Sequence, residues 1–325
     1  MDQEYEKHLA DVHEQMATPD HVIADAVREA THKDISAKTR LVHGEGNEVY
    51  DLELIDGSHV IERISGYEDK DFEQERWAIE QCEKLGIPVP KVLLVNHPIL
   101  DNKRVDICVQ EKLEGDLLER GHTNFRALPE KQLKTIAAQA GELLHRMHTI
   151  PTKGFGYLNG KGEGQFNTFT EMMEAEAALD NPDKYMKLAD KVGFDRDAMV
   201  KIVKVVSNGV RSAPPITPVL THNDFHPRHI LVKDGRVTGL IDFGEVTGNS
   251  PVSDFAKWDY CDGDWLPLEW LKEGYADKQV FQGGFEEMVH WMKLEHGLSR
   301  LRWYDYRHYA KGVEDAKKKL MTLCI

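Results

Sequence analysis

The chain has 325 residues, of which 41% are hydrophobic and 30% charged, and its formal net charge is −15. This length is sufficient for two lobes with separate cores, and the acidic balance argues against a nucleic-acid partner, because a phosphate backbone needs a basic surface. No run approaches the roughly 20 apolar residues of a membrane span, and the acidic N-terminus is not typical of a secretion signal. The four cysteines show no C-x-x-C pairing. We therefore expect a cytoplasmic protein with free thiols.

The N-terminal part of the sequence predicts a helical extension followed by an antiparallel sheet. The first 35 residues are charged and have a helical pattern, and residues 41–54 indicate a strand, a glycine turn and a second strand. Asp56-Gly57 is a typical hairpin turn, and a third strand covers residues 59–64. We expect the extension to lie against the lobe that this sheet forms.

The glycine turn contains Gly44, Gly46 and Asn47. Glycines allow a backbone to come close to phosphate oxygens and offer N–H groups without a blocking Cβ. An ordinary hairpin is the better explanation of a short Gly-x-Gly taken alone. The turn therefore gains a functional interpretation only from the segments that follow it.

A helix and two further strands complete this part of the chain. Residues 71–85 carry apolar side chains at helical spacing. Residues 92–95 and 105–110 predict two apolar strands, and the second continues into residues 111–115. We expect the rest of the chain to be helical apart from one hairpin, with helices at 133–147, 169–179 and 197–210 and several after Pro251.

That hairpin brings together the side chains best suited to chemistry. Asp224 and His229 precede its first strand, Asp234-Gly235 supplies a type I′ turn, and Asp242 ends the returning strand. A carboxylate able to take a hydroxyl proton, beside two ligands able to hold Mg²⁺, is what phosphoryl transfer requires. The two strands are residues 230–232 and 237–241.

The hairpin sequence resembles the kinase-like pattern H-x-D-x-x-x-x-N followed by D-F-G, and more closely the pattern of the aminoglycoside phosphotransferase family. His222, Asp224 and residues 241–244 match in place, while Asn223 replaces the usual Gly. His229 stands where the family usually has Asn. A His at this position resembles the macrolide phosphotransferase branch. Imidazole can bind the metal, although it suits Mg²⁺ less well than oxygen does.

The resemblance covers roughly residues 35–300 and implies an α+β, two-lobed, protein-kinase-like fold. Residues 1–113 would form the nucleotide-binding lobe, with a small antiparallel sheet and the helical extension. Residues 114–325 would form a mostly helical lobe that holds the catalytic hairpin and the substrate cleft.

The resemblance also implies roles for individual residues. Asp224 would be the catalytic base, and His229 and Asp242 would hold Mg²⁺. Asp254 is similar to a helix-capping residue that braces the active-site loops.

On the nucleotide side, Arg63 is similar to the cation of the third strand that meets the phosphates, although the neighbouring Glu62 leaves the register uncertain by one residue. Glu75 matches the helix residue that pairs with this cation. Residues 111–115 resemble the hinge whose backbone holds a purine base, so adenine and guanine are not distinguished, and ATP and GTP both remain possible donors. The nucleotide-binding set is Gly44, Gly46, Asn47, Arg63, Glu75, Glu111 and Leu113.

Two other kinds of protein are compatible with parts of the sequence. A metallohydrolase could bind zinc through His222, Asp224, His226 and His229, but this would leave the upstream segments unexplained. A nucleotide-binding pseudokinase would agree with the Arg at position 63 and the His at position 229, while Asp224 and Asp242 count against it.

The substrate is expected to be a small molecule with a hydroxyl group, and an aminoglycoside-type antibiotic is favoured. A macrolide is the second choice, and a sugar or amino alcohol is also compatible. The acidic residues that would wall the cleft for a cationic substrate are Asp254, Asp259, Asp262, Asp264, Glu269 and Glu273, whereas Trp258, Trp265 and Trp270 could form an apolar wall for a macrolide.

Overall fold

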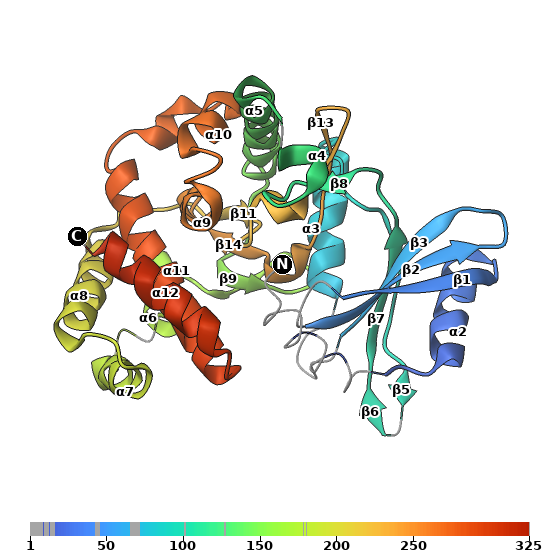
Figure 1. Cartoon of the computed structure of the whole chain (residues 1–325), viewed down its shortest axis with the longest axis horizontal. Coiled ribbons are helices and arrows are strands. Elements are labelled where there is room, and N and C mark those ends of the chain that lie inside the picture. Colours follow the sequence, from blue (N-terminus) through green and yellow to red (C-terminus); the bar gives the residue numbers. More distant parts are fainter. Residues whose placement is uncertain are drawn as a thin grey trace.

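The structure is a computed structural model that describes residues 9, 13, 17–42, 46–65, 72–100, 102–126, 128–177, 179 and 181–324. It has a smaller lobe built around a sheet and a larger, mostly helical lobe, which lie side by side (Figure 1). This is the α+β, two-lobed architecture that the sequence predicts.

In the smaller lobe, five antiparallel strands of the described chain form a sheet in the order β1-β2-β3-β7-β4. Along β2 every second side chain is buried, as expected for a strand with one face on a core. Helix α2 (Asp20–Thr31) covers that face with Ile23, Ala26 and Val27, so the predicted helical extension does lie against this lobe. The strands are β1 (Ile35–Leu41), β2 (Asn47–Leu54), β3 (His59–Ser65), β4 (Val92–Asn96) and β7 (Asp106–Glu111).

Helix α3 (Glu73–Lys84) lies between the sheet and the larger lobe (Figure 1). Its buried side chains follow helical spacing and include the acidic Glu75. Between β4 and β7 the chain forms a short hairpin of β5 (Ile99–Leu100) and β6 (Lys103–Arg104).

The two lobes are joined after β7. This strand ends at Glu111, and β8 (Asp116–Leu117) already pairs with β12 (Ile230–Lys233) of the catalytic hairpin. The carbonyl of Glu114 accepts a hydrogen bond from Thr238 Oγ1 at 2.5 Å. The predicted division at residues 113/114 therefore falls in a connection that is tied directly to the hairpin.

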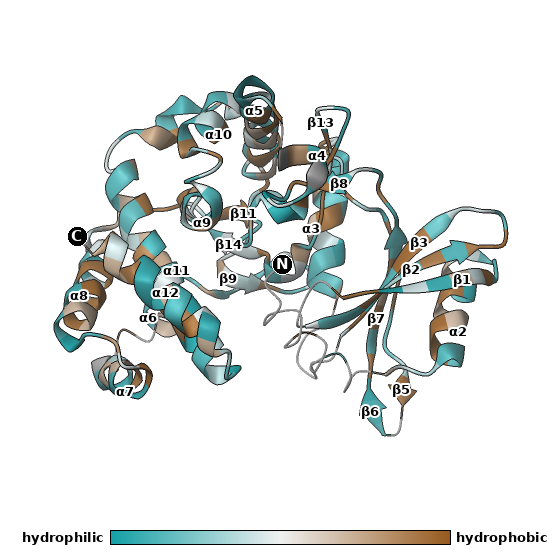
Figure 2. Ribbon diagram, in the orientation of Figure 1, coloured by the Kyte–Doolittle hydropathy of each residue, from teal (hydrophilic) through white to brown (hydrophobic). Residues whose placement is uncertain are grey.

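The larger lobe packs its helices around one apolar core that includes Phe225, Phe255 and Trp258. Apolar and polar residues alternate along α3, α5 and α8, as expected for helices with one buried face (Figure 2). The helices of this lobe are α4 (Thr123–Arg126), α5 (Glu130–Met147), α6 (Phe169–Glu176), α7 (Pro182–Val192), α8 (Arg196–Ser212), α9 (Val252–Asp262), α10 (Leu268–Gly274), α11 (Phe285–Tyr306) and α12 (Ala310–Leu323).

The expectation that this lobe is helical apart from the hairpin is wrong. Four short strands of the described chain form a second sheet in the order β10-β9-β14-β11, and β8 adds a third strand to the hairpin. Each has only two to four residues, too few to show a period in the sequence. They are β9 (Phe155–Leu158), β10 (Gly164–Phe166), β11 (Val219–Thr221) and β14 (Thr247–Asn249).

The second sheet supports the active-site segment, because β11 and β14 flank the hairpin in sequence and pair with each other. At their ends, Thr221 Oγ1 donates to the Thr247 carbonyl at 3.0 Å. All four cysteines are free thiols, as predicted. Across the described ranges, no helix combines the length and apolar character needed to cross a membrane.

Candidate active site

The catalytic hairpin consists of β12 and β13 (Arg236–Leu240), joined by Asp234 and Gly235. Both turn residues have positive φ values, 51° and 74°, as a type I′ turn requires. Beyond the ladder, the Ile241 N–H donates to the His229 carbonyl at 3.0 Å. This bond places Asp242, the next residue, beside His229, as the sequence predicts.

The His229 ring lies between two aspartates. Its Nδ1 is 2.9 Å from the Asp224 carbonyl oxygen, and its Nε2 is 3.4 Å from Asp242 Oδ2. A carbonyl can only accept, so Nδ1 carries the hydrogen of this bond, and Nε2 is the ring nitrogen that faces Asp242. One imidazole nitrogen and one carboxylate oxygen at this separation fit a shared divalent cation.

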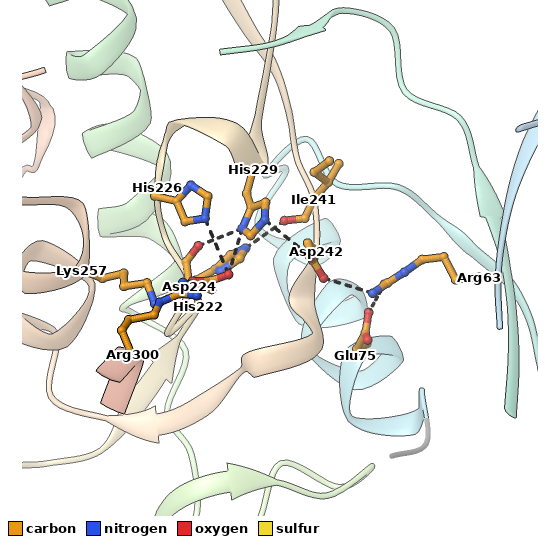
Figure 3. Close-up of polar contacts among 10 residues, drawn as sticks. All are labelled: Arg63, Glu75, His222, Asp224, His226, His229, Ile241, Asp242, Lys257 and Arg300. Carbon is orange, nitrogen blue, oxygen red and sulfur yellow. Dashed lines mark hydrogen bonds and ion pairs between the residues drawn. The ribbon is translucent and has the colours of Figure 1, made fainter. Parts of the chain in front are cut away.

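Asp224 is surrounded by basic side chains (Figure 3). Its Oδ1 is 2.7 Å from Lys257 Nζ and 3.6 Å from a guanidinium nitrogen of Arg300. Its Oδ2 lies 3.7 Å from His226 Nε2 and 3.6 Å from His229 Nδ1. Burial alone would raise the pKa of Asp224, but the Lys257 ammonium and the two imidazoles outweigh burial and hold this pKa well below its usual value.

Asp254 of α9 holds the loop that carries Asp224. Its carboxylate accepts hydrogen bonds from the backbone N–H groups of His222 at 2.9 Å and Asn223 at 2.7 Å. Asn223 has a φ of 61°, a left-handed conformation in which the usual Gly of the pattern is unstrained. His148 Nε2 lies 3.0 Å from the same carboxylate. The predicted bracing role is confirmed, but Asp254 does not cap its own helix, whose N-cap is Pro251.

Across the lobe boundary, Arg63 connects the small lobe to the hairpin. Its guanidinium forms an ion pair with Glu75 of α3 and lies 3.1 Å from Asp242 Oδ1 (Figure 3). The Asn47 amide oxygen, in the orientation that satisfies both amide atoms, accepts from the same guanidinium at 3.1 Å. Strand register is thereby resolved, since Arg63 faces the hairpin while Glu62 faces the core under α2.

The remaining residues predicted to bind nucleotide lie around this ion pair or at the hinge. Gly46 directly precedes β2, whereas Gly44 lies outside the described residues. Glu111 ends β7, and its N–H donates to the Lys91 carbonyl at 2.9 Å. Leu113 follows in the connection between the lobes, and a Cβ on Gly239 would lie 2.5 Å from its side chain.

Of the four residues that could bind zinc, three lie close enough to share a metal ion. Asp224, His226 and His229 have ligand atoms within 4.8 Å of one another. His222 instead directs Nε2 to the Ile241 carbonyl at 3.0 Å. Its ring is fully buried and serves the packing of the hairpin.

The acidic residues expected to wall the cleft have partners of their own. The carboxylates of Asp259, Asp264, Glu269 and Glu273 each form an ion pair with a neighbouring Lys or Arg. The three tryptophans expected to form an apolar wall also have other positions. Trp258 is fully buried, and Trp265 and Trp270 pack against the core.

The structure reveals functional candidates that the motif did not indicate. Lys257 and Arg300 contact Asp224 from α9 and α11, far along the sequence. A second group consists of Glu176, Glu245 and Glu295, from α6, the turn after the hairpin and α11. Burial, followed by the charges of Glu295 and Glu245, raises the pKa of Glu176 to about 7. No local pattern identifies either group.

Known proteins are similar to this chain in sequence and in fold. The model of the phosphotransferase enzyme family matches residues 38–279. A hygromycin-B 4-O-kinase from Escherichia coli is 22% identical over 278 residues, which are 84% of this chain and 72% of that protein.

Two solved structures illustrate the shared fold. A thermostable mutant of an aminoglycoside phosphotransferase, in ternary complex with ADP and hygromycin B, superposes with a TM-score of 0.72 at 18% identity, covering 93% of this chain and 97% of that one. A macrolide 2′-phosphotransferase from Brachybacterium faecium gives a TM-score of 0.55 at 15% identity, covering 92% and 97%. The predicted kinase-like fold is thus confirmed, and the chain belongs to the phosphotransferase enzyme family as a small-molecule phosphotransferase.

Proposed function

We propose that the protein transfers the γ-phosphoryl group of a nucleoside triphosphate to a hydroxyl of an aminoglycoside-type molecule. The observation that carries this proposal is the convergence of Asp224, His229, Asp242 and Arg63 from both lobes within one network of contacts. In this reaction the bond between the γ-phosphorus and its bridging oxygen breaks, and a bond to the substrate hydroxyl forms. The hydroxyl proton passes to the Asp224 carboxylate.

His229 and Asp242 are proposed to hold Mg²⁺. The cation, when bound, would neutralise charge on the phosphate oxygens. The protein's own contribution is the orientation of the two ligands. The Asp224 carbonyl fixes the tautomer of His229, and Arg63 at 3.1 Å fixes the other oxygen of Asp242.

Arg63 is proposed to meet the nucleotide phosphates, with Glu75 and Asn47 holding its guanidinium in place. The backbone at Gly44 and Gly46 would lie above the phosphates, and Glu111 and Leu113 would hold the base through the hinge. The related aminoglycoside phosphotransferase was solved in complex with ADP, which supports a nucleotide donor for this protein.

An aminoglycoside is supported by the relationship to the hygromycin-B kinase and by Glu176, Glu245 and Glu295, of which the last two raise the pKa of the first through their charges. Such carboxylates suit ammonium groups. A macrolide is the second candidate, because His229 resembles that branch, but of the tryptophans expected to line an apolar wall Trp258 is buried in the core, and Trp265 and Trp270 pack against it.

The test is phosphoryl transfer from ATP or GTP with Mg²⁺, measured across hygromycin B, kanamycin, erythromycin and a set of sugars and amino alcohols. Transfer to an aminoglycoside would support the proposal. Transfer only to erythromycin, or only to a sugar or amino alcohol, would show that the proposed acceptor class is wrong and would identify the acceptor instead. Nucleotide binding without transfer to any compound would leave the acceptor class unsupported.

A further inference from the structure

Lys257 forms the shortest contact with the catalytic carboxylate among the described residues. Its ammonium is 2.7 Å from Asp224 Oδ1, and the whole residue is only 8% exposed. The contact is a close ion pair, and opposite charges at this distance attract each other more strongly where little water separates them. Nothing in the hairpin sequence indicates this residue, which lies on α9.

Helix α9 holds the catalytic loop at two points three residues apart. Asp254 accepts from the backbone N–H groups at positions 222 and 223, and Lys257 holds the side chain of Asp224. Positions three apart lie on the same face of a helix. The helix is itself anchored by Trp258, whose indole donates to the Leu266 carbonyl at 2.8 Å and whose rings stack on Phe225.

The two oxygens of Asp224 are held unequally. Oδ1 forms an ion pair with Lys257 at 2.7 Å and lies 3.6 Å from Arg300, whereas Oδ2 is 3.6 and 3.7 Å from the nearest imidazole nitrogens. Those longer distances exceed normal hydrogen bonds. The carboxylate is therefore fixed through Oδ1, while Oδ2 remains available as an acceptor on the side of His229 and the proposed metal ligands.

We propose that Lys257 is a positioning residue, which fixes the Asp224 carboxylate through Oδ1 so that Oδ2 receives the substrate hydroxyl, with Arg300 supporting the same oxygen. This inference rests on the proposed role of Asp224 as the base. Without the ammonium, the carboxylate can rotate toward His226 or Arg300, both already close to it. A catalytic group that is misplaced by about 1 Å can lose about 10²-fold in rate.

The test is Lys257→Met, which keeps the length of the side chain and removes its charge. We expect kcat to fall by roughly 10²-fold, with KM for both substrates and nucleotide affinity within about threefold of wild type. Lys257→Arg should recover part of the loss, since it restores a positive charge beside Asp224. Lys293→Met is the matched control, because Lys293 forms a similar ion pair with Asp259 at 2.5 Å but does not contact Asp224.

A double-mutant cycle distinguishes positioning from a general structural effect. In an Asp224→Asn background, Lys257→Met should lower kcat little further, because the group that it positions is already lost. An equal loss in both backgrounds would overturn the proposal, as would a wild-type kcat in Lys257→Met or a change confined to the KM of the acceptor. If Lys257→Met does not fold, Lys257→Gln takes its place in the same cycle.

The cycle also separates this inference from the proposed function. If Asp224→Asn itself retains wild-type turnover, the proposed base is wrong and the positioning role fails with it. If Asp224→Asn is inactive but the two substitutions are additive, only the role of Lys257 is overturned. Should no compound of the panel accept phosphate, Mg²⁺-dependent nucleotide hydrolysis supplies kcat for the same comparison.

Discussion

Asp224 is an ionised carboxylate of low basicity, and this suits phosphoryl transfer. The transition state for such transfer is loose, so the nucleophile needs orientation more than early removal of its proton. Lys257 and the imidazoles keep the pKa of Asp224 well below its usual value despite burial. The carboxylate therefore stays charged at neutral pH, ready to accept a hydrogen bond from a hydroxyl.

Asp224→Asn tests this role directly. An amide keeps the shape of the side chain but cannot take a proton, so we expect kcat to fall by roughly 10²- to 10⁴-fold. Nucleotide affinity should stay near wild type, because other residues are proposed to hold the nucleotide. Steady-state kinetics and nucleotide titration measure the two quantities. Turnover within a few fold of wild type would remove Asp224 from the role of base.

His229 should influence which metal ion the enzyme prefers. Imidazole nitrogen suits Mn²⁺ relatively better than Mg²⁺, whereas an amide oxygen favours Mg²⁺. His229→Asn should therefore remain active with Mg²⁺ and show a lower ratio of Mn²⁺-supported to Mg²⁺-supported activity. Pulsed electron paramagnetic resonance of bound Mn²⁺ should detect nitrogen coupling in the wild type and lose it in the variant.

Asp242→Ala is the comparison for that experiment. It deletes the charged ligand and should abolish metal-dependent nucleotide binding, measured by calorimetry with and without Mg²⁺. Complete inactivity of a well-folded His229→Asn protein would contradict the proposed equivalence of His and Asn at this position.

At the scale of the element, strand β3 places neighbouring charged side chains in two different environments, one on each face of the sheet. Arg63 faces the active site, while Glu62 is fully buried under α2, where neither of its carboxylate oxygens has a hydrogen-bond partner among the described residues. Burial, with a smaller effect from Glu48, raises the pKa of Glu62 to about 8. The side chain is therefore neutral in the folded protein at pH 7.

This predicts a pH-dependent stability of the small lobe. Between about pH 4.5 and 8 the unfolded chain ionises Glu62 but the folded protein does not, so the free energy of unfolding falls as pH rises. Glu62→Gln removes this titration and should stabilise the protein, on the order of 2–4 kcal/mol at pH 8 and little at pH 4.5. Glu53→Gln, on neighbouring β2, is the control, and denaturant unfolding at both pH values measures the difference.

The elements that the sequence predicts are those with a long period or a definite turn. The β12–β13 hairpin was predictable because Asp234-Gly235 marks its turn and the motif fixes its register. The strands β9, β11 and β14 were not, since segments of three or four residues show no period and their pairing is long-range. The roles of Lys257 and Arg300 were hidden for the same reason, because only tertiary packing brings α9 and α11 to Asp224.

At the scale of the whole molecule, the charge of −15 does not by itself identify a cationic substrate. Several acidic residues after the hairpin are neutralised locally, as Asp264 is by Arg120 at 2.9 Å and Glu273 by Lys134 at 2.6 Å. The carboxylates that remain relevant are Glu176 and Glu295, which are partly exposed, and the charge of Glu295 helps to raise the pKa of Glu176. Substrate recognition should therefore depend on a few residues within the large lobe and little on the overall charge.

This distinction predicts how substitutions and salt affect the acceptor. Glu176→Gln and Glu295→Gln should raise the KM of an aminoglycoside several-fold, while Asp264→Asn and Glu273→Gln should leave it unchanged, because their carboxylates are paired with surface cations.

Added salt should also raise the KM of an aminoglycoside, since it screens the remaining charge pairs over a Debye length of about 10 Å at 0.1 M. A macrolide, held mainly by apolar contact, should respond little to salt. We would measure KM for hygromycin B, kanamycin and erythromycin at low and high salt for each variant. An aminoglycoside KM that follows the surface variants and ignores Glu176 and Glu295 would show that the substrate binds elsewhere, because neutralising a carboxylate can weaken binding only where an ammonium group comes close to it.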